Sequence, residues 1–160
     1  MSTFDSGLRP FSFQRRPIPV PGDLRISWRV SLILLMLGNS RSNKASLAKL
    51  HVLNDAIRSN QHERLRSAVT GAKLTLPWNL RVEPAFARAV DFVVGEKLAG
   101  WTKASSRSAL QLTAAGVSAF NQLLKMDDAL VEEKAILAEL AKVIPEGAVS
   151  HLLGERRNAA

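Results

Sequence analysis

The chain has 160 residues, of which 46% are hydrophobic and 22% are charged, so it can bury a core of ordinary size. It contains no cysteine, which excludes disulfides, zinc–thiolate sites and thiol catalysis. The longest apolar run, Val30 to Leu37, is much shorter than the roughly 20 residues of a membrane-spanning helix, and the sequence opens without a signal-peptide pattern. We therefore expect a cytoplasmic protein that makes no membrane contact.

The net charge is +8, and the positive excess lies in the first half of the chain. Residues 1–30 contain five arginines against two aspartates, and residues 31–82 contain eight basic side chains against two acidic ones. Residues 127–160 instead contain seven acidic side chains against four basic ones. A basic front half favours contact with phosphate groups of a polyanion such as nucleic acid.

Residues 1–23 are predicted to form an extended arm, because four prolines and three phenylalanines occur there without a helical or strand period. Phe11 and Phe13 are candidates for partner binding. Arg15 and Arg16 are candidates for contacts with nucleic-acid phosphates. A disordered leader is the alternative for this segment, and the sequence leaves both open.

Residues 24–37 are apolar on more than one helical face, which predicts a central core helix ending at Gly38. A polar loop at 40–44 follows and supplies Arg41 and Lys44, two further candidates for phosphate contact. Ser46 can then cap the next helix through its side-chain oxygen.

Beyond that helix, residues 61–68 predict a further short helix. Residues 74–82 alternate between apolar and polar side chains, which predicts a strand-like connection, and Pro77 would confine that strand to a sheet edge. We interpret residues 59–81 as an insertion.

The segment from 82 to 124 predicts a helix, a two-stranded hairpin and another helix. Pro84 suits a first helical turn, and Gly100 is the expected stop. Trp101 opens an edge strand, residues 103–108 form a turn, and Thr113 caps the last helix. This order is the second half of a winged helix. The predicted fold class is therefore mainly α with a small β-hairpin, in which a winged helix-turn-helix core at 24–126 lies between the extended arm and C-terminal helices.

Residues 127–160 are predicted to form a C-terminal helical extension, with Asp127 or Asp128 as the cap of its first helix and Pro145 near its end. Its apolar side chains recur at spacings of three and four. They either cover the winged-helix core or bind a partner, which includes self-association. The candidates for partner binding are Leu130, Ile136, Leu137 and Leu140.

No pattern of catalytic or metal-ligating residues occurs in the sequence. His51 and Asp55 lie one helical turn apart, but three scattered histidines without cysteine do not make a ligand set. No phosphate-cradling glycine loop is present, so any ATP hydrolysis must belong to a partner. We expect no enzymatic activity, no metal and no cofactor.

Five stretches of the chain carry a resemblance to a known family. They are residues 24–37, Ala-Ser-Leu-Ala-Lys-Leu-His-Val-Leu-Asn at 45–54, Arg-Val-Glu-Pro-Ala-Phe-Ala-Arg-Ala-Val-Asp at 81–91, the Leu-Thr exit from the hairpin, and Leu-Val-Glu-Glu-Lys-Ala-Ile-Leu at 130–137. Together they resemble the middle component of ABC three-component systems. The resemblance implies a non-enzymatic winged-helix adaptor subunit that works with an SMC/Rad50-like ABC ATPase and an effector subunit, in prokaryotic anti-phage or anti-plasmid defence of the Lamassu type.

The helix at 84–100 is predicted to be a poor reader of DNA bases. Its charged side chains, Arg88, Asp91, Glu96 and Lys97, include two acidic ones, the segment from 83 is slightly negative, and it has no asparagine or glutamine. Lys103 and Arg107 in the hairpin can still hold phosphates, which predicts at most non-specific DNA contact. Two hypotheses stay open. The chain is an adaptor subunit of an ATPase complex, or it is a homodimeric winged-helix transcription regulator that binds a palindromic operator.

Overall fold

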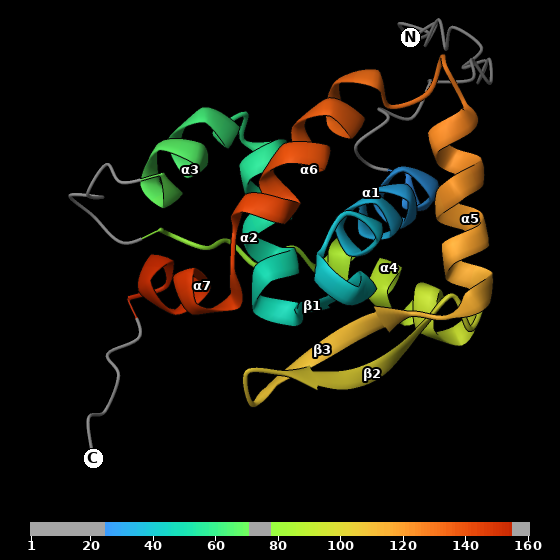
Figure 1. Ribbon diagram of the computed structural model, residues 1–160, viewed down its shortest axis with the longest axis horizontal. Helices are drawn as coiled ribbons and strands as arrows, with labels where there is room; N and C mark the ends of the chain where they lie inside the picture. Colours follow the sequence, from blue (N-terminus) through green and yellow to red (C-terminus); the bar gives the residue numbers. More distant parts are fainter. Residues whose placement is uncertain (1–24, 71–77, 155–160) are drawn as a thin grey trace, which may run out of the picture.

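The computed structural model describes residues 25–70 and 78–154. Within these ranges the protein is mainly α-helical with a small antiparallel sheet, as predicted (Figure 1). No helix in the described part of the chain is long and apolar enough to cross a membrane. In chain order the elements are α1 (Ile26–Gly38), the single 3-10 turn η2 (Arg41–Asn43), β1 (Lys44–Ser46), α2 (Leu47–Arg58), α3 (His62–Val69), α4 (Pro84–Gly95), β2 (Ala99–Ala104), β3 (Arg107–Leu112), α5 (Ala114–Lys125), α6 (Val131–Val143) and α7 (Glu146–Leu152).

Some predictions lie on residues that the structure does not describe. The arm at 1–23 falls there with all four of its candidates, and so does the first part of the strand predicted at 74–82. The described part of that predicted strand, residues 78–82, forms no strand. The backbone N–H of Trp78 instead donates to the carbonyl oxygen of Leu152 at 2.7 Å. The prediction was wrong here because this connection bonds to α7 and not to a sheet.

The sheet has three strands, one more than the predicted hairpin. β3 lies between β1 and β2, and both pairings are antiparallel. Leu110 of β3 is the register partner of both Ala45 and Trp101. The sequence missed β1 because a strand of three residues is too short to show an alternating pattern. The hairpin turn is also tighter than predicted, since only Ser105 and Ser106, both with positive φ, separate β2 from β3.

Helix α4 ends earlier than Gly100, the residue predicted to stop it. Lys97 has a φ of 58°, and its N–H donates to the carbonyl of Val94. The next N–H, from Leu98, donates to the carbonyl of Val93. This pair of bonds around a left-handed residue is a Schellman motif. Gly100 consequently lies inside β2.

Helix α1 forms the centre of the described structure. It packs against α2, α4, α5, α6 and the sheet, and Figure 1 shows it enclosed by them. Five consecutive residues from Ile33 to Leu37 are at most 6% exposed, which confirms the prediction of a central core helix. Because every face of α1 touches another element, its sequence is apolar all round.

The C-terminal helices cover this core. Leu137 and Leu140, two candidates for partner binding, are fully buried, so they are not available to a partner in this structure. Leu130 and Ile136 are partly buried and pack against the same core. The amphipathic stripe of α6 therefore faces inward. The predicted cap is also wrong, because Leu130 takes the N-cap position of α6 with a left-handed backbone.

A buried ion pair connects α1 to the start of α4. Arg29 is 1% exposed, and its Nε donates to Oε1 of Glu83 at 3.0 Å. The other carboxylate oxygen accepts from Nδ2 of Asn54 at 3.2 Å and lies 3.4 Å from Nε of Arg58. Burial acts to raise the pKa of Glu83, but the hydrogen bonds from Arg29 and Asn54 and the two arginine charges outweigh burial and lower it. One carboxylate thus connects α1, α2 and α4.

We expect Glu83→Gln to lower the free energy of unfolding by about 3–5 kcal/mol, because the variant leaves the Arg29 charge buried without a counter-charge. The pKa of Glu83 is lowered on folding, so its contribution is complete above the ordinary glutamate pKa and is lost as the pH falls through the lowered value. Urea unfolding at several pH values measures both effects. Arg66→Gln, which breaks the pairs with the exposed carboxylates of Glu63 and Glu139, should cost less, at most about 1 kcal/mol for each pair. A double variant, Arg29→Met with Glu83→Gln, that is no more stable than Glu83→Gln alone would contradict this account.

Gly116 lets α5 approach the end of α4. A Cβ at this position would lie 1.9 Å from the carbonyl oxygen of Leu98. Thr113 caps α5, as predicted, since its Oγ1 accepts from the N–H of Gly116 at 3.1 Å, and the N–H of Thr113 itself donates to Leu98. The start of α5 is therefore fixed against backbone, which cannot move aside as a side chain can.

Gly116→Ala should destabilise the protein by about 1–3 kcal/mol or more, because the added methyl group overlaps a backbone carbonyl. Gly147→Ala is the matched control: the glycine is helical in α7 and its Cβ would meet nothing within 4 Å. The control should be stabilised by about 0.5–1 kcal/mol through helix propensity. Thermal and urea unfolding measure the stability of both variants. Equal changes in the free energy of unfolding would show that the contact between Gly116 and the carbonyl of Leu98 leaves room for a methyl group.

Candidate functional site

Helix α4 turns one face to the core and presents the other to solvent. Phe86, Ala89, Val90 and Val93 are buried, as the apolar spacing predicted. Arg88, Asp91 and Phe92 lie at spacings of three and four on the opposite side and are exposed. We call these three residues the α4 face. The face carries one positive and one negative charge, and Phe92 is 44% exposed.

A second exposed aromatic lies on the strand that packs against α4. Trp101 of β2 is 53% exposed, although tryptophan usually buries much more of its large surface. β2 is the edge strand of the sheet, as predicted for this residue. Exposed aromatic side chains are typical of surfaces that bind other proteins.

The four described candidates for phosphate contact do not form one patch. Lys103 pairs with Ser108 and Arg107 with Ala104, so Lys103 and Arg107 belong to opposite faces of the hairpin. Arg107 donates from Nη2 to the hydroxyl of Ser150 in α7 at 2.7 Å. The other two candidates, Arg41 and Lys44, lie together in a separate cleft.

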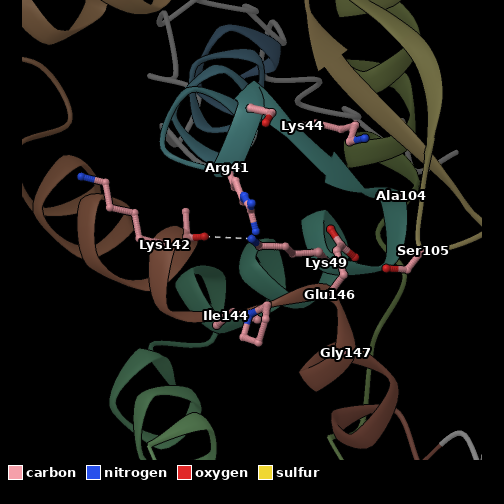
Figure 2. A pocket seen from close by; sticks show the side chains of 12 residues that line it. Arg41, Lys44, Lys49, Ala104, Ser105, Lys142, Ile144, Glu146 and Gly147 are labelled. Carbon is pink, nitrogen blue, oxygen red and sulfur yellow. Dashed lines mark hydrogen bonds between the residues drawn. The ribbon is translucent and has the colours of Figure 1, made fainter.

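This cleft has a volume of about 550 Å³ and opens between two distant parts of the chain (Figure 2). One side is formed by η2, β1 and the first turn of α2, and the other by the junction of α6 and α7. The tip of the β2–β3 hairpin completes it. We call it the basic cleft; its lining residues are Arg41, Ser42, Lys44, Lys49, Ala104, Ser105, Ala141, Lys142, Ile144, Pro145, Glu146 and Gly147.

Lys49 lies at the base of the basic cleft. It is only 4% exposed, and its Nζ donates to the carbonyl oxygen of Ala141 at 2.8 Å, the bond drawn in Figure 2. Ala141 belongs to the last turn of α6, where unpaired carbonyls favour a cation. Burial lowers the pKa of Lys49, because desolvation disfavours its charge, and the nearby carboxylate of Glu146 opposes this only in part.

Among the described residues, Glu146 is the one carboxylate that lines the basic cleft. Its Oε1 accepts from the backbone N–H of Ser46 at 2.9 Å, which ties α7 to the start of α2. The side chain of Ser46 accepts from the N–H of Lys49 at 3.1 Å and so caps α2 as predicted. Sequence reasoning missed Lys49, Lys142 and Glu146, because nothing in the local pattern brings residues about one hundred positions apart together.

The lowered pKa of Lys49 predicts a pH dependence of stability. Between the folded-state pKa and the ordinary lysine value, the unfolded chain binds more protons, so the free energy of unfolding rises with pH. We therefore expect the stability of the wild type relative to Lys49→Met to increase from pH 7 to pH 10, as measured by urea unfolding. Lys142→Met, which removes an exposed lysine of the same cleft, is measured beside it as the control for loss of a positive charge. If the difference in free energy of unfolding between the wild type and Lys49→Met does not change with pH, the pKa of Lys49 is not lowered on folding.

The residues His51 and Asp55 do not form the pair that their spacing suggested. The ring of His51 packs against Phe86 with centroids 5.0 Å apart, and burial lowers its pKa. Asp55 accepts from Nε1 of Trp78 at 3.0 Å beside a second cleft of about 360 Å³. The Arg64 guanidinium lies 5.2 Å from the centre of the Trp78 ring. Both groups thus have structural neighbours, and among the described residues no cluster of three or more histidine or acidic side chains is placed to hold a metal ion.

Comparisons of this chain with protein-family models, with curated proteins and with solved structures give no match. The proposals below rest on two features of the described surface: the α4 face together with the exposed Trp101 of β2, and the basic cleft.

Proposed function

We propose that this chain is a non-enzymatic winged-helix adaptor subunit. In this proposal it works in the cytoplasm with an SMC/Rad50-like ABC ATPase and an effector subunit, in a prokaryotic anti-phage or anti-plasmid defence complex. ATP hydrolysis belongs to the partner, and the adaptor contacts DNA non-specifically if it contacts DNA at all. The partners are proposed from the sequence resemblance. The exposed side of α4 is the structural observation that supports an adaptor role.

The order of the elements supports the winged-helix assignment. A strand, β1, precedes α2, a hairpin follows α4, and the three strands are antiparallel with β3 in the centre. In this arrangement α4 takes the place of the helix that enters the major groove in DNA-binding members of the class. Helix α3 and the connection after it then form the insertion between the two helices of the helix-turn-helix unit.

The exposed side of α4 is the observation that carries the adaptor proposal. A helix that reads DNA presents arginine, lysine, asparagine or glutamine to the base edges. The α4 face instead offers Arg88, Asp91 and the half-exposed Phe92. With no net charge and an exposed aromatic, this surface suits contact with a protein better than contact with a polyanion. Trp101 on the adjacent strand extends the aromatic character.

A homodimeric transcription regulator is the second candidate, and one feature of α5 favours it. Leu124 is 45% exposed and Met126, which follows the helix, is 52% exposed. Two exposed apolar side chains at the end of one helix suit self-association. In this case the protein would be a dimer that protects a palindromic operator.

Expression with the neighbouring genes, followed by affinity purification, mass spectrometry and light scattering, distinguishes the two candidates. Recovery of a large coiled-coil ATPase supports the adaptor. A lone homodimer that footprints a palindrome supports the regulator.

The adaptor proposal makes a prediction for Phe92. We expect Phe92→Asp to weaken binding of the ATPase at least tenfold, because a charge would replace an aromatic side chain within the interface. Val131→Asp is the matched control, since Val131 is 60% exposed at the start of α6, and it should bind as the wild type does. Leu124→Asp should also keep the ATPase and would instead dissolve the regulator's dimer. Size-exclusion chromatography and pull-down measure all three, and an unchanged complex with folded Phe92→Asp would refute the role of the α4 face.

A further inference from the structure

The basic cleft contains more positive charge than its own residues balance. Arg41, Lys44, Lys49 and Lys142 line it, against the single carboxylate of Glu146. One oxygen of that carboxylate accepts the backbone N–H of Ser46, and the other, Oε2, is buried without a hydrogen-bond partner among the described residues. Its single negative charge offsets one of the four positive charges. The cleft therefore has a net positive charge, which favours binding of an anion.

Two of these cations turn toward the same part of the cleft. In the view of Figure 2 the guanidinium of Arg41 is directed toward the ammonium of Lys49, whereas the side chains of Lys44 and Lys142 point outward on either side. Within the described ranges the Arg41 guanidinium has no hydrogen-bond or ion-pair partner. Like charges that line one cleft repel each other, and burial of Lys49 reduces the screening of this repulsion by water.

Lys49 also has donors to spare. An ammonium group carries three N–H donors, and Ala141 takes one of them. Lys49 is only 4% exposed, so its remaining donors have little access to bulk water. A buried group with unused donors is costly unless a ligand or a water supplies the acceptors.

We propose that the basic cleft binds a phosphate group, with Arg41 and Lys49 as its direct donors. Phosphate oxygens match this arrangement, because arginine and lysine are the usual phosphate-binding side chains and charge-assisted bonds to them are strong. Ser105, at the hairpin tip, adds a hydroxyl to the rim. The volume of about 550 Å³ exceeds what a lone phosphate fills and lies in the range of small-molecule sites. The phosphate therefore belongs either to a free nucleotide or to a nucleic-acid backbone. This site does not depend on the adaptor function.

Calorimetric titration with pyrophosphate and AMP, at constant ionic strength, tests the free-nucleotide source. We expect binding by the wild type and at least a roughly tenfold loss in Arg41→Gln, in keeping with the strength of a charge-assisted bond. Lys125→Gln is the matched control: it removes one exposed positive charge from the end of α5, outside the cleft, and should bind normally. In a second readout, the NMR titration of the Lys49 side chain, bound phosphate should raise the pKa of Lys49.

Fluorescence anisotropy with a 15-bp duplex tests the backbone source. If the cleft holds a backbone phosphate, Arg41→Gln should weaken DNA binding and reduce the slope of log affinity against log salt by about 1. Lys125→Gln should leave this slope unchanged. Lys49→Met should weaken the binding of whichever probe, nucleotide or duplex, the wild type binds. The proposal is overturned if neither probe binds, or if Lys125→Gln weakens binding as much as folded Arg41→Gln.

Discussion

The carboxylate of Glu83 is the constraint on which the arrangement of the helices depends. Glu83 precedes α4 as its N-cap residue, yet its side chain does not cap that helix and turns inward to Arg29 of α1. Asn54 and Arg58 of α2 approach the second oxygen. A buried charge is costly unless it is paired and hydrogen-bonded, so these three groups favour this placement of the start of α4. The network is not fully satisfied, since Nη1 of Arg29 and Oδ1 of Asn54 are buried without a hydrogen-bond partner among the described residues.

A second set of polar bonds fixes the C-terminal helices. Lys49 donates to the last turn of α6, and Glu146 accepts from the backbone at Ser46. In both bonds the donor belongs to the start of α2 and the acceptor to the α6–α7 junction. Leu137 and Leu140 are fully buried and supply apolar contact between α6 and the core. The two hydrogen bonds orient α6 and α7 relative to the start of α2. The basic cleft lies beside these bonds, since Lys49 and Glu146 both line it.

Local signals in the sequence predicted the helices and two of the capping side chains, but they misplaced the cap of α6 and the end of α4. They also failed where contacts are distant. The oxygens of Ser46 and Thr113 could be assigned because capping acts within three residues. β1 could not, since its three residues form a strand only through their pairing with β3. The stripe of α6 was ambiguous for a related reason, because periodicity identifies an apolar face without saying what covers it. Arg41 and Lys44 were found as isolated cations, whereas their companion Lys142 became visible only once the chain was folded.

The hairpin bears on how the protein uses its charge. In a winged helix that grips DNA, the hairpin projects beside the reading helix and offers its basic residues to the backbone. Here Arg107 bonds to Ser150 of α7, and Ser105 at the hairpin tip lines the basic cleft. The hairpin is therefore docked on the C-terminal helices, and Lys103 lies on its opposite face. The positive charges of the basic cleft come from Arg41, Lys44, Lys49 and Lys142, which lie in η2, β1, α2 and α6 and not in the hairpin. Our two proposals therefore rest on different surfaces, the α4 face for a protein and the basic cleft for a phosphate.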